Sequence, residues 1–73
     1  MRASEATIHH TAQINEGCVI GAGAIIGPGA RVLGRIRIGD GAIIGPGAVV
    51  FRDVPAGAVA IGDPARIYHA PNA

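Results

Sequence analysis

The sequence predicts an all-β domain, a parallel β-helix built from units of six residues. Every sixth residue is Ile or Val in eight consecutive units, namely Ile8, Ile14, Ile20, Ile26, Val32, Ile38, Ile44 and Val50. Two residues earlier in each unit, seven of eight side chains are small, in the column Ala6, Ala12, Cys18, Ala24, Ala30, Ile36, Ala42 and Ala48. A period of six matches neither an amphipathic helix nor a continuous strand. Each unit is therefore expected to be a short strand followed by a tight turn.

The two columns also predict where the core lies. Side chains two residues apart project from the same face of a strand, so the small and aliphatic columns share the inward face. One unit cannot bury that face alone and has to stack on copies of itself. The residue after each aliphatic position is Gly or Asn in five of the eight units. We expect this position to be a turn residue with positive φ.

Taken in order, strands are expected over 7–8, 12–14, 18–20 and 24–26, and the same spacing continues to Val50. The corners 27–29 and 45–47 are both Gly-Pro-Gly and lie three units apart, which is one full coil of a three-sided helix. After Val50 we expect a turn-rich exit over 51–58, one further strand over 59–61, and a loop over 62–67 before a mobile tail. The prediction is one short β-helix domain over 1–73, with about three coils of repeats in 6–55 and a C-terminal exit and tail in 56–73.

Composition limits the class of protein and its partners. A chain of 73 residues has a small core, and its single cysteine cannot form an internal disulfide, so we expect an oligomer. The formal net charge of +1 argues against a nucleic-acid partner. No apolar run has membrane-spanning length, and the start of the chain lacks the apolar core of a signal peptide. We therefore expect a cytoplasmic protein with no membrane partner.

The outward-facing residues sort onto three faces when three units make one coil. One face carries Thr7, Ile25 and Ile43, and only this face stacks two isoleucines. A contiguous apolar stripe on a small domain indicates a partner surface, whereas single surface aliphatics are ordinary. Both interpretations stay open at this point, and the need for additional buried area favours an interface.

Several segments resemble the hexapeptide repeats of bacterial acyltransferases. The repeats at 20–24 and 38–50, the exit at 49–55 and the closing Gly-Asp-Pro-Ala-Arg-Ile at 62–67 look like that family's pattern and C-terminal signature. The segment 31–39 is most similar to serine O-acetyltransferases. The similarity covers 8–67. It implies a left-handed β-helix with three units per coil, a homotrimer, and acyl transfer from CoA to a hydroxyl or amine of a small-molecule acceptor. The homotrimer agrees with the apolar stripe, so we expect packing through a face that includes Ile25 and Ile43.

The resemblance also suggests site residues. The family uses a histidine as general base, for which His10 is the first candidate, His9 the alternative and His69 a distant third. In serine acetyltransferases that histidine precedes the strand aliphatic by three residues in a His-Pro pair, whereas His10 precedes Ile14 by four and is followed by Thr11. The residues that match CoA-binding positions of the family are Pro28, Pro46, Phe51, Arg52 and Arg66.

The remaining chemistry-bearing residues are interpreted as structural. Cys18 lies in the small inward column and is predicted to be a core residue rather than a nucleophile. No spacing of Cys, His or Asp predicts a metal site. Two functions are kept: an acyltransferase that uses acetyl-CoA as co-substrate to modify an oxygen or nitrogen, or the C-terminal part of one, and a non-catalytic trimeric scaffold that has lost the active site.

Overall fold

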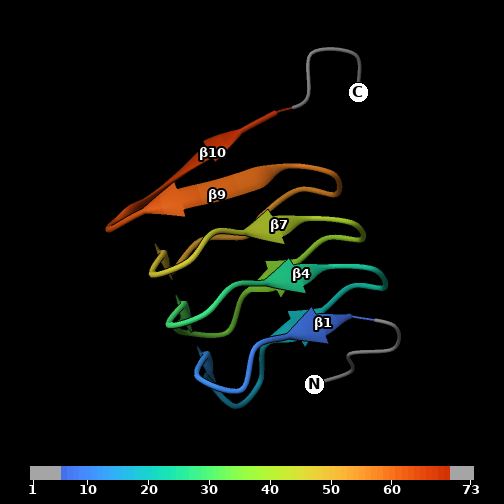
Figure 1. Cartoon of the computed structure of the whole chain (residues 1–73). Coiled ribbons are helices and arrows are strands. Elements are labelled where there is room, and N and C mark those ends of the chain that lie inside the picture. Colours follow the sequence, from blue (N-terminus) through green and yellow to red (C-terminus); the bar gives the residue numbers. More distant parts are fainter. Residues whose placement is uncertain (1–5, 70–73) are drawn as a thin grey trace.

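A computed structural model describes residues 6–69 as a parallel β-helix of three coils, capped by a β-hairpin (Figure 1). The elements are β1 (Thr7–Ile8), β2 (Gln13–Ile14), β3 (Val19–Ile20), β4 (Ile25–Ile26), β5 (Arg31–Val32), β6 (Arg37–Ile38), β7 (Ile43–Ile44), β8 (Val49–Val50), β9 (Val59–Gly62) and β10 (Ala65–Tyr68). In this part of the chain, no helix has the length and hydropathy of a membrane span. The expected mobile tail at 71–73 lies outside the described residues.

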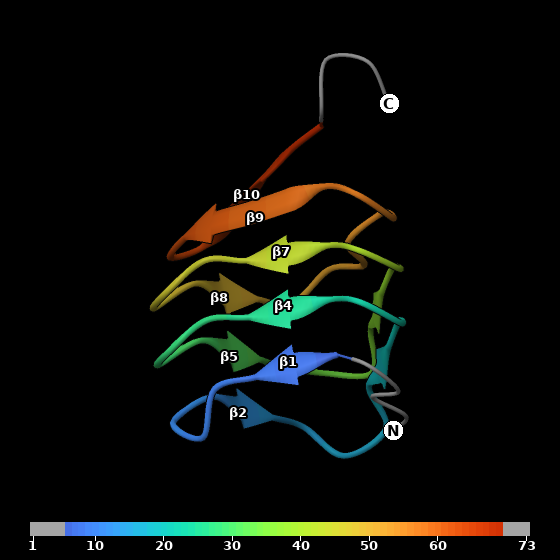
Figure 2. The same cartoon turned by 45° about the vertical axis from the view of Figure 1, so that its right-hand side comes forward.

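The strands form the three faces of a triangular, left-handed helix (Figure 2). One face has the order β1-β4-β7-β9-β10, the second β2-β5-β8, and the third β3-β6. The parallel register pairs Thr7 with Ile25 and Ile25 with Ile43, so each strand lies beside the strand three units further along the chain. The predicted coil of three six-residue units is therefore confirmed.

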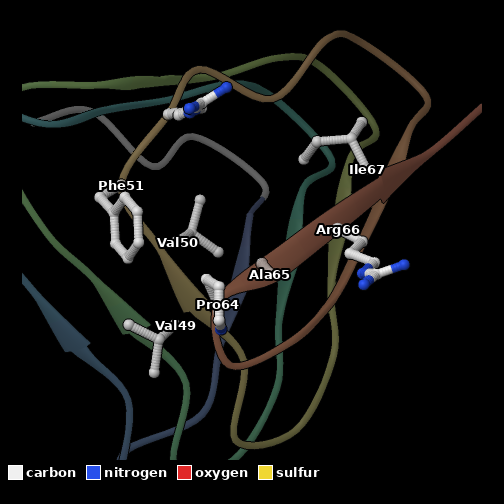
Figure 3. A pocket seen from close by; sticks show the side chains of 8 residues that line it. Val49, Val50, Phe51, Pro64, Ala65, Arg66 and Ile67 are labelled. Atoms are coloured by element: carbon white, nitrogen blue, oxygen red, sulfur yellow. The ribbon is translucent and has the colours of Figure 1, made fainter.

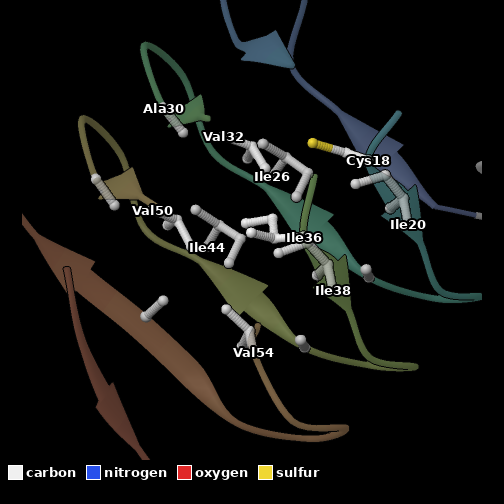
Figure 4. Close-up of a cluster of buried hydrophobic side chains, with 14 of the residues drawn as sticks. Cys18, Ile20, Ile26, Ala30, Val32, Ile36, Ile38, Ile44, Val50 and Val54 are labelled. Carbon is white, nitrogen blue, oxygen red and sulfur yellow. The ribbon is translucent and has the colours of Figure 1, made fainter. Parts of the chain in front are cut away.

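The two sequence columns form the core (Figure 4). From the second half of the first coil onward, every residue of both columns is buried, from Cys18 and Ile20 to Ala48 and Val50. Ile8 and Ile14, in the first two units of the described chain, are only half-buried and pack against the edge of this core. Cys18 is fully buried and its Sγ–H donates to the Gly34 carbonyl at 2.9 Å, which confirms that it belongs to the core.

The glycines do not have the role that the sequence suggested. Positive φ occurs three residues after the aliphatic position, for example at Gly29 (71°) and Gly47 (72°), and not at Gly27 or Gly45. Gly27 is required for a different reason: a Cβ there would lie 2.8 Å from the Pro46 nitrogen of the next coil. The column directly after the aliphatic residue therefore allows close approach of stacked backbones, and the turn conformation is set two residues later.

The chain leaves the repeat through a shortened coil and a hairpin. Val54 pairs with Ile38 and Val59 with Ile43, so the last coil is two residues shorter than the coils before it. The further strand expected over 59–61 is present as β9. The loop expected over 62–67 is instead a tight turn followed by β10, which pairs antiparallel with β9. Gly62, with φ of 104°, and a cis Asp63–Pro64 peptide form that turn, so the turn residues join two strands where the sequence suggested an extended loop.

Candidate functional site

A pocket of about 380 Å³ lies at the C-terminal end of the β-helix, between strand β8 and the hairpin. Eight residues line it: Val49, Val50, Phe51, Arg52, Pro64, Ala65, Arg66 and Ile67. The first four end β8 and begin the exit. The last four come from the turn and β10, which the antiparallel pairing folds back over the helix end. The hairpin therefore forms one side of the pocket.

The pocket combines an apolar floor with an aromatic rim. The inward-facing Val50 is buried, whereas Phe51 is 54% exposed and offers much of its ring to a ligand. Figure 3 shows the Phe51 ring beside Val50 with Val49 below them, Pro64 and Ala65 near the centre, and the Arg66 side chain extending away on the opposite side. Such an exposed ring in a concave site can stack on a planar group.

The charge of the pocket is positive. Arg52 and Arg66 are both exposed, and none of the eight lining residues, all within the described part of the chain, is acidic. Guanidinium groups present several N–H donors in a planar fork that fits phosphate oxygens. The arrangement can bind a ligand that carries both phosphate and an aromatic or apolar group.

Three of the five residues predicted to bind CoA, Phe51, Arg52 and Arg66, come together in this pocket. Pro28 and Pro46 do not line it. They stack on each other in the corner that joins the first face to the second, where the Gly47 N–H donates to the Pro28 carbonyl at 2.9 Å. Pro46 lies three residues before β8, so this corner leads up to the pocket.

His10 occupies the same corner column one coil below Pro28. Successive coils are about 4.8 Å apart, which puts the His10 corner roughly 10 Å along the axis from the Pro46 corner. His10 is exposed, and its ring stacks on His9 with centroids 4.5 Å apart and planes at 28°. His69 follows the end of β10 and is also exposed. One chain therefore does not bring His10 into its own pocket.

Of the pocket residues contributed by the hairpin, the sequence predicted Arg66 and missed Pro64, Ala65 and Ile67, and it also missed the hydrogen-bonding role of Thr11. The alternation of apolar and charged residues at 65–67 was a usable strand signal, and it agrees with the alternating burial of β10. Thr11 carried no signal, because its partner Gly29 lies one full coil away and its hydroxyl direction depends on the folded corner. Among residues 6–69, no group of three His, Cys, Asp or Glu side chains is placed to hold a metal ion.

The chain matches one protein family by its repeat pattern. The family described as "Bacterial transferase hexapeptide (six repeats)" matches residues 4–34 and 18–52, which together cover more than half of the sequence. No curated protein sequence matches the chain.

Solved structures with a similar fold include serine acetyltransferases. A Neisseria gonorrhoeae serine acetyltransferase, solved in complex with serine, has 27% identity and a TM-score of 0.70 over 89% of this chain and 38% of its own. A soybean serine acetyltransferase, also complexed with serine, has 33% identity and a TM-score of 0.67 over 89% of this chain and 36% of its own. This chain thus spans little more than a third of these enzymes' length.

A GDP-perosamine N-acetyltransferase variant from Caulobacter crescentus, solved with CoA and GDP-perosamine, shares the fold at 24% identity. Its TM-score is 0.54 over 89% of this chain and 57% of its own.

Proposed function

The chain belongs to the bacterial hexapeptide-repeat transferases, and from this premise we propose that it is an acetyl-CoA-dependent O- or N-acyltransferase, or the C-terminal part of one. The observation that carries the proposal is the pocket at the helix end, where Phe51, Arg52 and Arg66 gather. An exposed aromatic ring with two arginines among the residues that line the same pocket suits the adenine and phosphates of CoA. The similarity to serine acetyltransferases supports the acetyl group as the one transferred.

The corner column supplies a path for the rest of the CoA molecule. With its nucleotide in the pocket, the pantetheine arm would lie along the corner of Pro46 and Pro28. Small corner residues let such an arm approach backbone amides, so the column fits an extended, narrow chain. These residues would bind and orient CoA and would take no part in bond making.

The reaction would be a direct transfer. His10 would accept the proton of the acceptor hydroxyl or amine, whose oxygen or nitrogen attacks the thioester carbonyl carbon. Collapse of the tetrahedral intermediate breaks the carbon–sulfur bond and releases the CoA thiolate, which takes up the proton from the imidazole. An acyl-enzyme on cysteine is not part of this scheme, because Cys18 is the only cysteine and is fully buried.

We also propose that the chain acts as a homotrimer. The face of β1, β4, β7, β9 and β10 carries exposed or half-buried apolar side chains from four of its five strands, in the set Ile25, Ile43, Val59, Ile61 and Tyr68. Burial of this stripe between subunits would also bring the pocket of one chain toward the His10 corner of another. That arrangement would join the two halves of the site that one chain keeps apart.

A scaffold without activity is the competing function. The altered spacing around His10, and the small share of the serine acetyltransferases that the chain spans, both favour it. A titration with acetyl-CoA, followed by turnover measurements on a panel of small hydroxyl and amine acceptors, separates the two. Saturable binding with acceptor-dependent release of CoA supports the enzyme, and binding without turnover on any acceptor supports the scaffold.

A further inference from the structure

The corner that holds the two histidines is hydrogen-bonded to the next coil differently from three other glycine-containing corners. At Gly41, Gly47 and Gly57, the backbone N–H donates to a carbonyl of the corner one coil below, at 2.9 Å in each case. At the histidine corner, the Gly29 N–H instead donates to the Thr11 hydroxyl oxygen, also at 2.9 Å. A side chain has here replaced a backbone acceptor.

This replacement orients the Thr11 hydroxyl. Its oxygen accepts from Gly29 and lies 2.9 Å from His9 Nδ1, while the Thr11 backbone N–H donates to the same nitrogen at 3.2 Å. A backbone N–H can only donate, so Nδ1 must carry a lone pair and no proton. The hydroxyl then donates to Nδ1 as well. Neutral His9 therefore holds its proton on Nε2.

The fixed ring of His9 in turn supports His10. The two rings stack with centroids 4.5 Å apart, and both side chains are exposed. The side-chain hydrogen bonds of this corner involve His9 and Thr11, so the two imidazoles are held by different contacts. His9 is held through Nδ1, and, among the residues that the structure describes, the ring of His10 contacts the ring of His9.

We propose that Thr11 is the positioning residue of the histidine pair: its hydroxyl and amide select the Nε2–H form of His9, and the held ring sets the orientation of His10. The two histidines then have different roles: His9 donates a hydrogen bond, and His10 acts as the general base. The use of this arrangement in acyl transfer rests on the proposed function. The tautomer and the contact to Gly29 do not.

Nitrogen-15 NMR of histidine-labelled protein tests the positioning directly, at a pH where the imidazoles are neutral. In the wild type, His9 should show one unprotonated and one protonated nitrogen, assigned to Nδ1 and Nε2. Thr11→Val keeps the shape and the backbone N–H that donates to Nδ1 but removes the hydroxyl, so it should weaken the selection and shift both His9 signals part of the way toward an average of the two tautomers. Thr11→Ser keeps the hydroxyl and should preserve the wild-type signals.

Amide exchange supplies a second readout with an internal control. In Thr11→Val, exchange of the Gly29 amide should accelerate by roughly threefold to tenfold, the factor that corresponds to one lost hydrogen bond. The Gly47 amide, which donates to a backbone carbonyl, should not change. Averaged His9 signals in the wild type would overturn the proposal, and so would a Thr11→Val variant with unchanged His9 and Gly29 signals.

Turnover measurements distinguish failure of the positioning role of Thr11 from failure of the proposed acyltransferase activity. If an acceptor is found, Thr11→Val should lower kcat by about tenfold and leave the KM for acetyl-CoA unchanged, and Thr11→Ser should restore kcat. Altered NMR signals with full kcat in Thr11→Val would overturn the role of Thr11 in the reaction. Absence of turnover in every variant would contradict the enzyme, and the NMR signals would still decide the tautomer of His9.

Discussion

Arg52 and Arg66 are the two cations of the C-terminal pocket, and they lie on separate segments that only the hairpin brings together. If they pair with phosphates of CoA, loss of either guanidinium removes a charge-assisted contact. Such a contact contributes about 1.5 kcal/mol, so Arg52→Ala and Arg66→Ala should each weaken acetyl-CoA by roughly tenfold. Dephospho-CoA should be affected much less if the contact is to the 3′-phosphate. Isothermal titration calorimetry on both ligands measures the difference.

Arg37 provides the matched control for this comparison. It is exposed on β6 and lies outside the pocket, so Arg37→Ala removes the same charge without touching the site. Equal weakening by all three substitutions would mean that the net charge attracts CoA and that the pocket does not recognise it. Equal losses for acetyl-CoA and dephospho-CoA would contradict pairing with the 3′-phosphate.

Removal of the Cys18 sulfur tests whether this side chain serves only to pack the core. Its thiol is fully buried and donates to the Gly34 carbonyl. Cys18→Ala should leave a small void and cost about 1 kcal/mol of unfolding free energy, with CoA binding unchanged. Urea denaturation followed by circular dichroism gives the first value. A loss of activity at wild-type stability would show that the thiol takes part in the chemistry.

Of the candidate site, the sequence predicted the residues that belong to the C-terminal signature and did not predict contacts between residues far apart in the chain. Phe51 and Arg52 are adjacent, and the turn at 62–64 brings Arg66 to them, so the signature already contained most of the pocket. The contacts of Thr11 could not be predicted, because they depend on the stacking of one coil on the next and on a side-chain rotamer. The placement of His10 within an active site depends on further chains and remains a prediction.

Among the elements, strand β4 offers two neighbouring isoleucines with opposite surroundings. Ile26 points into the central stack and is 1% exposed, whereas Ile25 points outward and is 45% exposed. Ile26→Asp places an unpaired charge in an apolar core, at a cost comparable to the several kcal/mol by which a small domain is stable. We expect no folded protein by circular dichroism.

Ile25→Asp is the control on the same strand. It puts the same side chain on the outer face, so the β-sheet signal should persist. A folded Ile26→Asp variant would contradict the assignment of the inward column, and an unfolded Ile25→Asp variant would mean that the chain folds only when its outer face is covered.

The repeat made the elements of the coils predictable, because one period specifies strand, face and coil at once. The spacing of Ile and Val predicted the eight short strands, and the Gly-Pro-Gly corners 18 residues apart, together with the family resemblance, predicted three units per coil. The glycine conformations were assigned to the wrong turn position, since a sequence column does not distinguish the need for positive φ from the need for room. The same limit explains β10: Gly62 and Pro64 indicate a turn, and only pairing with β9 decides that a strand follows.

At the scale of the whole molecule, the exposed apolar face predicts the assembly. Ile25 and Ile43 continue into Val59, Ile61 and Tyr68 of the hairpin, so the stripe runs along most of one side of the β-helix. We expect sedimentation equilibrium to give three times the chain mass of 7.3 kDa. A double change, Ile25→Asp with Ile43→Asp, should shift the protein toward the monomer, because two charges would be buried in the interface.

The control for the assembly is a pair of changes on the other two faces, one on each. Val19 is 46% exposed on β3, and Gln13 is exposed on β2, so Val19→Asp with Gln13→Asp adds the same charges away from the stripe. This variant should keep the wild-type mass. A folded monomer at micromolar concentration in the wild type would refute the trimer.

His10 is the proposed general base of a site that the trimer would complete. Loss of a general base lowers the rate of the chemical step by about 10²–10⁴-fold, so His10→Ala should reduce kcat by that factor. Affinity for acetyl-CoA should stay close to that of the wild type, because the corner lies away from the pocket. Steady-state kinetics and calorimetry on the same variant check both statements. If His10→Ala keeps full activity and His9→Ala loses it, the general base is His9 and the assignment of His10 is wrong.

Mixed trimers test whether the base and the pocket come from different chains. His10→Ala subunits keep an intact pocket, and Arg52→Ala subunits keep an intact histidine, so neither variant alone forms a complete site. If the site lies between subunits, a mixed trimer contains one interface that joins the intact His10 of one chain to the intact pocket of its neighbour. The assay is run with acetyl-CoA well below its dissociation constant for Arg52→Ala, where both variants are impaired. Co-refolding of the two variants should then raise activity above that of either variant alone, with at most one intact site per trimer. If His10 serves the pocket of its own chain, every site in the mixture carries a defect and the activity stays between those of the two variants.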